Sequence, residues 1–99
     1  MKLEFHPAAS EEFIEAGEYY EAALPGLGRR FLLAVRKTTE LAREHSESGV
    51  PGPGSSRRLA VSGFPYDIVY RRRDDDLLEV LAVAHQRRRP GYWRERIPR

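Results

Sequence analysis

The sequence predicts an α+β protein in which an antiparallel sheet carries a hairpin of two helices on one face. Three observations predict this class. Apolar residues alternate with polar ones at the start of the chain, recur with helical spacing through two following segments, and return to strand-like patterns after residue 56. The resulting order is β-α-α-β-β-β. Because a chain of 99 residues suits one small domain, we expect residues 1–99 to fold as a single unit.

The first strand and the first helix follow from the spacing of apolar residues. Residues 2–6 alternate, which puts Leu3 and Phe5 on the strand face that meets the core. Pro7 suits the first turn of a helix. The apolar positions after it recur every three or four residues and form one helix face: Ala9, Phe13, Ala16, Tyr20 and Ala23.

The opposite face of this helix is acidic. Four glutamates occupy it, and we interpret them as a solvated surface rather than as catalytic pairs: Glu11, Glu15, Glu18 and Glu21. We also expect Glu11 and Glu12 in the first turn, where the helix dipole favours acidic residues.

The second helix is expected to begin after the break at Pro25-Gly26 and to end near His45. Its apolar stripe consists of Leu27, Phe31, Ala34, Val35, Thr38 and Ala42. Because the connection is short, the two helices should be antiparallel neighbours. Residues 46–56 are rich in serine, glycine and proline and are predicted to be a loop.

Three strands complete the predicted sheet as an antiparallel meander. They are residues 57–61, residues 66–71, and the almost wholly apolar run 77–84, which should be central. Residues 74–76 are three aspartates and form the last turn. Tyr66 and Tyr70 share one strand face, so they are either exposed contact residues or core residues beneath the helices.

Composition excludes several classes of function. The chain has no cysteine, which excludes disulfides, thiol catalysis and cysteine-based zinc sites. Its three histidines lack metal-ligand spacing, so we expect neither a metal nor a cofactor. No apolar run approaches the roughly 20 residues that span a bilayer, and the first residues do not resemble a secretory signal. We therefore expect a cytoplasmic protein with no membrane partner.

Charge is strongly segregated along the chain. Residues 1–24 carry one lysine against six glutamates, whereas residues 85–99 carry six arginines against one glutamate. The dense run Arg87-Arg88-Arg89, followed by Tyr92 and Trp93, suits phosphate contacts with base stacking, or docking onto an acidic protein. Alternatively, the two aromatic residues only pin the tail to the sheet edge while the arginines face water.

Several segments of the chain together form a recognisable pattern. The segments are Phe5-His6-Pro7-Ala8-Ala9, Pro25-Gly26-Leu27-Gly28 with Phe31, Phe64-Pro65-Tyr66 with Ile68 and Tyr70, and Ala84-His85-Gln86-Arg87-Arg88-Arg89-Pro90-Gly91-Tyr92-Trp93. In this order and spacing they resemble the RelE/ParE superfamily of toxins from type II toxin–antitoxin systems, and the resemblance covers nearly the whole chain. The family fold is also β-α-α-β-β-β.

The resemblance implies a toxin that blocks growth until its antitoxin binds it. The expected antitoxin is acidic, is encoded next to this chain, and covers the helical hairpin in a heteromeric complex. ParE-like members poison DNA gyrase, whereas RelE-like members cut mRNA on the ribosome. A third alternative is a non-toxic interaction module of the same fold.

The residues favour the ParE-like branch but leave the nuclease open. The strands after residue 56 contain no lysine, and arginine is a poor general base. If the chain is a nuclease, the candidate catalytic residues are His85, Arg87 and Tyr92, although Gln86 lies about where the family nucleases carry an arginine. A lone histidine at a strand end is more often structural. Candidate contacts to the target or to nucleic acid are Arg57, Arg58, Arg71, Arg72, Arg87, Arg88, Arg89, Tyr92 and Trp93.

Overall fold

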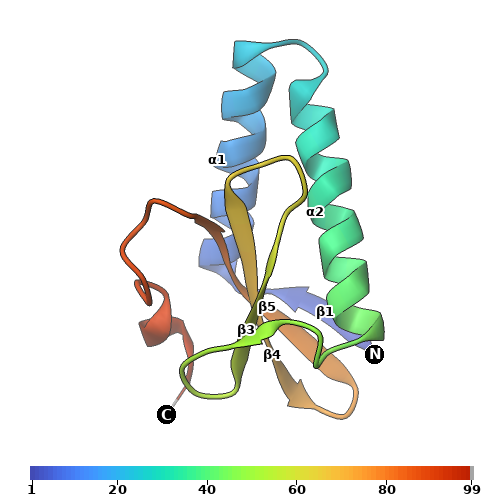
Figure 1. Cartoon of the computed structure of the whole chain (residues 1–99), viewed down its shortest axis with the longest axis vertical. Helices are drawn as coiled ribbons and strands as arrows, with labels where there is room; N and C mark the ends of the chain where they lie inside the picture. The colour runs from blue at the N-terminus through green and yellow to red at the C-terminus, as the bar shows by residue number, and fades with distance from the viewer. Residues whose placement is uncertain (99) are drawn as a thin grey trace.

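A computed structural model describes residues 1–98, and Arg99 of the basic tail lies outside the described residues. Two helices lie side by side and antiparallel against a mixed sheet (Figure 1). The sheet has five strands in the order β1-β5-β4-β3-β2. The elements are β1 (Lys2–Phe5), α1 (Pro7–Ala23), α2 (Leu27–Glu44), β2 (Val50–Pro51), β3 (Ser56–Ala60), β4 (Tyr66–Asp74), β5 (Leu77–His85) and the 3₁₀ helix η1 (Arg94–Arg96).

The predicted α+β class with a helical hairpin on one face is confirmed, with one difference in strand direction. The meander of β3, β4 and β5 is antiparallel, but β1 pairs in parallel with β5, from Lys2 beside Leu77 to Phe5 beside Val80. A parallel pair needs a long connection, which the hairpin and the meander together supply. The sheet is therefore mixed rather than wholly antiparallel.

Two further details differ from the sequence prediction. The loop expected over residues 46–56 contains β2, a strand of two residues that pairs with Arg57 and Arg58 of β3. A segment this short that includes a proline has no periodicity to detect. In addition, α1 begins at Pro7, so its first turn contains no acidic residue. The expectation that Glu11 and Glu12 occupy that turn was wrong, and both lie one turn further along.

The main core lies between the helices and the sheet. Ala9 and Ala16 are buried on α1, and their small side chains let the helix approach the sheet closely. Phe31 of α2 is completely buried at the centre of an aromatic cluster, with ring centroids 5.1 Å from Phe64 and 5.2 Å from Tyr66. The apolar helix stripes read from the sequence therefore face the core, as expected.

The two helices approach each other closely at their connection. A Cβ on Gly28 would lie 2.8 Å from the carbonyl oxygen of Gly17, so only glycine fits at this crossing. Glu21 accepts hydrogen bonds from the backbone amides of Gly26 and Gly28 at 3.0–3.1 Å. Its carboxylate thus caps the start of α2, where the helix dipole favours a negative charge. One of the four glutamates assigned to a solvated face therefore has a structural role.

Tyr70 is a core residue rather than a surface contact. It is 1% exposed and packs with Ala42 of α2 and Leu78 of β5. Its hydroxyl donates to the Ser46 carbonyl at 2.9 Å and accepts from the Gly49 amide at 3.0 Å. This one group therefore fixes the start of the loop that follows α2.

We expect Tyr70→Phe to destabilise the protein by about 1–2 kcal/mol, because a buried amide and a carbonyl would both lose their partner. Urea unfolding measures this change. Tyr19→Phe is the control, since Tyr19 is 68% exposed. Equal stability of the Tyr70→Phe variant and the wild-type protein would contradict the assignment.

Candidate functional site

The C-terminal segment folds back over the sheet face that the helices leave open. Pro90 precedes Gly91, whose φ of +74° makes the turn that reverses the chain. Trp93 is 8% exposed and packs on Val69 and Ala82. Val69 alternates with the helix-facing Ile68, so this second small core lies on the opposite face. Trp93 therefore pins the tail, in agreement with the structural alternative for this residue.

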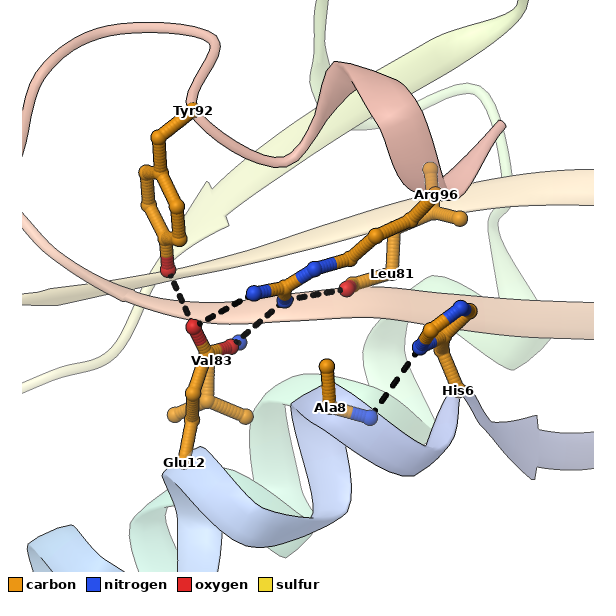
Figure 2. A network of polar contacts seen from close by, with 7 residues as sticks. All are labelled: His6, Ala8, Glu12, Leu81, Val83, Tyr92 and Arg96. Carbon is orange, nitrogen blue, oxygen red and sulfur yellow. Dashed lines mark hydrogen bonds and ion pairs between the residues drawn. The ribbon is translucent and has the colours of Figure 1, made fainter.

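A buried carboxylate on α1 binds the tail to the body of the protein (Figure 2). Glu12 accepts two hydrogen bonds from the Arg96 guanidinium, at 2.8 and 3.0 Å. It also accepts one from the Tyr92 hydroxyl at 2.7 Å and one from the Val83 amide at 3.1 Å. Each carboxylate oxygen accepts two hydrogen bonds, so all four acceptor positions of the carboxylate are used. We call Glu12, Tyr92 and Arg96 the carboxylate clamp.

The clamp replaces a missing strand along β5. Pairing between β1 and β5 ends at Val80, which accepts from the His6 amide at 2.9 Å. Beyond this point Glu12 takes the Val83 amide, and Arg96 donates to the Leu81 carbonyl at 2.9 Å. Leu81 is the extra residue of a β-bulge, because β4 pairs with Val80 and then Ala82. The ion pair thus satisfies backbone groups that β1 does not reach.

The electrostatics of the clamp favour its charged form. Burial raises the pKa of the Glu12 carboxyl, but the hydrogen bonds from Arg96, Tyr92 and Val83 outweigh burial, and the pKa is lowered overall. Burial and the bond to Glu12 raise the pKa of the Tyr92 hydroxyl far above its ordinary value. The bond to Glu12 also raises the pKa of the Arg96 guanidinium. The clamp is therefore ionised at neutral pH, with Tyr92 protonated as the donor.

Sequence reasoning missed both charged members of the clamp. Glu12 was counted only as a helix-dipole acid, and Arg96 only as part of the basic tail. A signal was present, since Glu12 lies three residues after Ala9 and four before Ala16. That spacing puts a carboxylate on the buried stripe of α1, where a charge needs a partner. The partner itself lies 84 residues further along the chain, so periodicity does not identify it.

Beside the clamp lies a cavity of about 340 Å³ between the tail and the open sheet face. We call it the basic cavity. It brings together six of the residues predicted from the sequence, and Arg94 with them: Arg58, His85, Arg88, Arg89, Tyr92 and Trp93. Among the described residues that line it, Asp67 alone is acidic, and its carboxylate accepts from the Gln86 amide at 3.2 Å.

The arginines of the basic cavity lack counter-ions among the residues that the structure describes. None of the four forms an ion pair with another residue in 1–98. The Arg88 guanidinium lies over the Tyr92 ring, 3.9 Å from its centroid. Four guanidinium groups around one concave surface repel each other unless an anion or an acidic surface binds there. The cavity is therefore chemically suited to bind negative charge.

The other predicted contact residues lie elsewhere. Arg57 donates to the carbonyls of Glu47 and Gly49, at 3.2 and 2.9 Å, and holds the loop before β2. Arg71 forms a largely buried ion pair with Glu79 at 3.0 Å, and Arg72 pairs with Asp75 at 3.3 Å. Arg87 is exposed but does not line the basic cavity.

Two of the three residues suggested for nuclease chemistry, His85 and Tyr92, form hydrogen bonds within the protein. The Nδ1 of His85 accepts the Arg87 amide at 3.1 Å, and its ring packs edge-on against Tyr66 at 5.1 Å. The Tyr92 hydroxyl donates to Glu12. The hydrogen bond from the Arg87 amide occupies Nδ1 of His85 and leaves Nε2 as the available ring nitrogen. The geometry therefore suits anion binding better than proton transfer.

A second concave surface lies on the outer side of the helical hairpin. It is an apolar groove of about 410 Å³ whose apolar lining includes Phe13 and Ile14 of α1 with Phe31 and Leu32 of α2. Ile14 is 56% exposed and Leu32 is 36% exposed. We call this surface the hairpin groove. Arg29 borders it, and a neighbouring hollow that shares Phe13 and Leu32 continues it toward Arg36.

No three histidine, aspartate or glutamate side chains in residues 1–98 come together as metal ligands. None of the helices formed by these residues has the length and apolar character to cross a membrane.

Known toxins resemble this chain in sequence pattern and in fold. A family model described as the ParE toxin of the type II toxin–antitoxin system parDE matches residues 3–90. A solved structure described as the chromosomal ParDE TA system from P. aeruginosa has a similar fold, with a TM-score of 0.71 and 13% identity. That match covers 86% of this chain and 95% of that chain, and at this identity it speaks for the fold alone. No curated protein matches.

We expect the contribution of Glu12 to stability to depend on pH. Its pKa is lowered in the folded state, so its ionised form stabilises the fold above the ordinary value of 4.5 and this stabilisation is lost as pH falls through the lowered value. Glu12→Gln should cost about 2 kcal/mol near neutral pH and progressively less below about pH 4.

Urea unfolding from about pH 7 to about pH 3 tests this expectation. Glu11→Gln is the matched control, because Glu11 is exposed on the same helix turn. A difference between Glu12→Gln and wild type that stays constant across this range would contradict the assigned ionisation.

Proposed function

This chain belongs to the ParE toxins of type II toxin–antitoxin systems, and we propose that it arrests growth by binding DNA gyrase and trapping its cleaved-DNA complex. The chain is thus the toxin component of such a system, as the sequence predicted. A toxin of this kind captures its target and needs no catalytic group of its own. We further propose that it acts in the cytoplasm, where gyrase works.

The basic cavity is the observation that supports a capturing mechanism. Its arginines have no counter-ion in residues 1–98, so an acidic target surface or a DNA phosphate would relieve their mutual repulsion. The Tyr92 hydroxyl and the Nδ1 of His85 are both engaged in hydrogen bonds within the protein. We therefore propose that Arg58, Arg88 and Arg89 contact the target directly.

The alternative is a ribosome-dependent mRNA endonuclease, and one observation favours it. His85 lines the basic cavity, and the hydrogen bond from the Arg87 amide occupies its Nδ1 but not its Nε2. Among the candidate catalytic residues His85, Arg87 and Tyr92, His85 therefore has the group that is available for proton transfer. A nuclease acting in this way would depend on the imidazole, whereas a gyrase poison would not. This difference separates the two mechanisms in one variant.

The antitoxin partner fits the hairpin groove. The groove is apolar along its floor, and its charged lining residues are Glu18, Glu21 and Arg29, so it suits the apolar face of an amphipathic helix. Binding there leaves the basic cavity on a different surface, which involves the tail and the open sheet face. We propose that an acidic antitoxin encoded next to this chain occupies the groove in a heteromeric complex.

We expect the antitoxin-free chain to accumulate linear plasmid DNA when it is incubated with gyrase, ATP and supercoiled plasmid and stopped with detergent. The variant Arg88→Gln/Arg89→Gln should need about tenfold more protein for the same yield, because two charge-assisted contacts are lost. Arg30→Gln is the matched control, because Arg30 is exposed on α2.

A folded wild-type chain that traps no gyrase complex would overturn the proposal. If the same chain instead cuts mRNA on ribosomes and His85→Ala abolishes the cleavage, the endonuclease takes its place. His85→Ala should otherwise leave gyrase trapping within about twofold of wild type.

We expect Leu32→Glu to weaken binding of the antitoxin encoded beside this gene by about a hundredfold, because an unpaired carboxylate would be buried in the groove. Leu41→Glu serves as the control, since Leu41 is 44% exposed on the same helix and does not line the groove. Calorimetric titration measures both. Equal affinities for the two variants would exclude the hairpin groove as the antitoxin site.

A further inference from the structure

We propose that Glu12 is a positioning residue for the basic cavity, which it shapes by holding Tyr92, and through Tyr92 the guanidinium of Arg88. Glu12 does not itself line the basic cavity, so it acts through other residues. This inference rests on the proposed function where it is tested by gyrase trapping. Its second test, the rate of trypsin cleavage, does not depend on that function.

The tail depends on the carboxylate clamp for its polar attachment. Backbone hydrogen bonds formed by residues 87–98 are all local, such as Arg88 to His85, Tyr92 to Arg89 and Arg96 to Trp93. Every hydrogen bond that links residues 87–98 to a described residue before His85 involves Glu12 or the Leu81 carbonyl. The remaining attachment is apolar and comes from Trp93 and Ile97.

The connection from Glu12 to the cavity passes through one aromatic ring. The Glu12 carboxylate holds the Tyr92 hydroxyl at 2.7 Å, which fixes the ring at the cavity wall. The Arg88 guanidinium lies 3.9 Å from the centroid of that ring, and Arg96 lies 5.2 Å from it. Arg88 forms no ion pair in residues 1–98, so the cation–π contact with Tyr92 is what orients it.

A glutamine at position 12 has nearly the same size but cannot replace the carboxylate. All four groups that contact the Glu12 carboxylate are hydrogen-bond donors. A glutamine amide offers one acceptor oxygen and a nitrogen that is itself a donor. Arg96 would also lose its counter-ion. The substitution should therefore release the tail without replacing any arginine of the basic cavity.

The first experiment compares full-length Glu12→Gln with wild type under conditions where circular dichroism shows both folded. We expect trypsin to cleave after Arg87 and Arg88 about tenfold faster in the variant, because release of the tail lets this exposed segment unfold locally into the protease. Gyrase trapping should need about tenfold more protein. Glu11→Gln, exposed on the same turn, should change neither.

A double-mutant cycle separates positioning from general destabilisation. If Glu12 acts by orienting Arg88, Glu12→Gln should reduce trapping about tenfold in the wild-type background and less than about twofold in an Arg88→Gln background. Equal losses in the two backgrounds would overturn the proposal, since a merely structural role lowers both alike.

Tyr92→Phe provides a second variant in case Glu12→Gln does not fold. It keeps the Glu12–Arg96 ion pair and the ring beneath Arg88, and removes only the hydroxyl. We expect a smaller effect in the same direction, about threefold in both assays.

Unchanged trypsin cleavage in both variants would overturn the proposal, as would faster cleavage with unchanged trapping. Should wild type trap no gyrase complex, the proposed function fails, and the proposal on Glu12 then stands or falls with the cleavage rates alone.

Discussion

The unpaired edge of β5 is the constraint on which much of this structure depends. β5 is an internal strand, yet its partner β1 is only four residues long and pairing ends at Val80. The Leu81 carbonyl and the Val83 amide must find partners elsewhere, because leaving them unsatisfied would cost about 1–3 kcal/mol each. The pair of Glu12 and Arg96 supplies both partners at once. One ion pair therefore completes the sheet and fastens the tail.

The clamp also pairs one residue of the acidic N-terminal part of the chain with one residue of the basic C-terminal part. One acidic residue of α1 and one basic residue of the tail neutralise each other where solvent is largely excluded, with 15% and 16% of their side chains exposed. Glu21 is used separately, as the cap of α2. The arginines that remain around the basic cavity have no such partner within residues 1–98, so their charge is available to a target.

The two candidate binding surfaces have different chemistry but share one helix. Phe13 and Ile14 contribute to the apolar hairpin groove, whereas Glu12, the preceding residue on α1, holds the tail that shapes the basic cavity. An apolar groove suits a folded amphipathic helix, and a basic cavity suits a negatively charged surface. A toxin that must meet both an antitoxin and a target can thus present separate surfaces from fewer than a hundred residues.

The sequence by itself determined the fold class, both helices, the three strands of the meander and the family. The fold class, the helices and the strands rest on local periodicity and on glycine and proline breaks, which are properties of neighbouring residues, whereas the family rests on the resemblance of several segments. It also indicated six of the residues that line the basic cavity, because five of them lie in the short segment 85–93. Only the tertiary structure decided that β1 runs parallel to β5, that Arg57 and Arg71 have internal partners, and that Glu12 binds Arg96. Each of these depends on groups far apart in the chain, and no local pattern records which distant group satisfies a buried charge or a free strand edge.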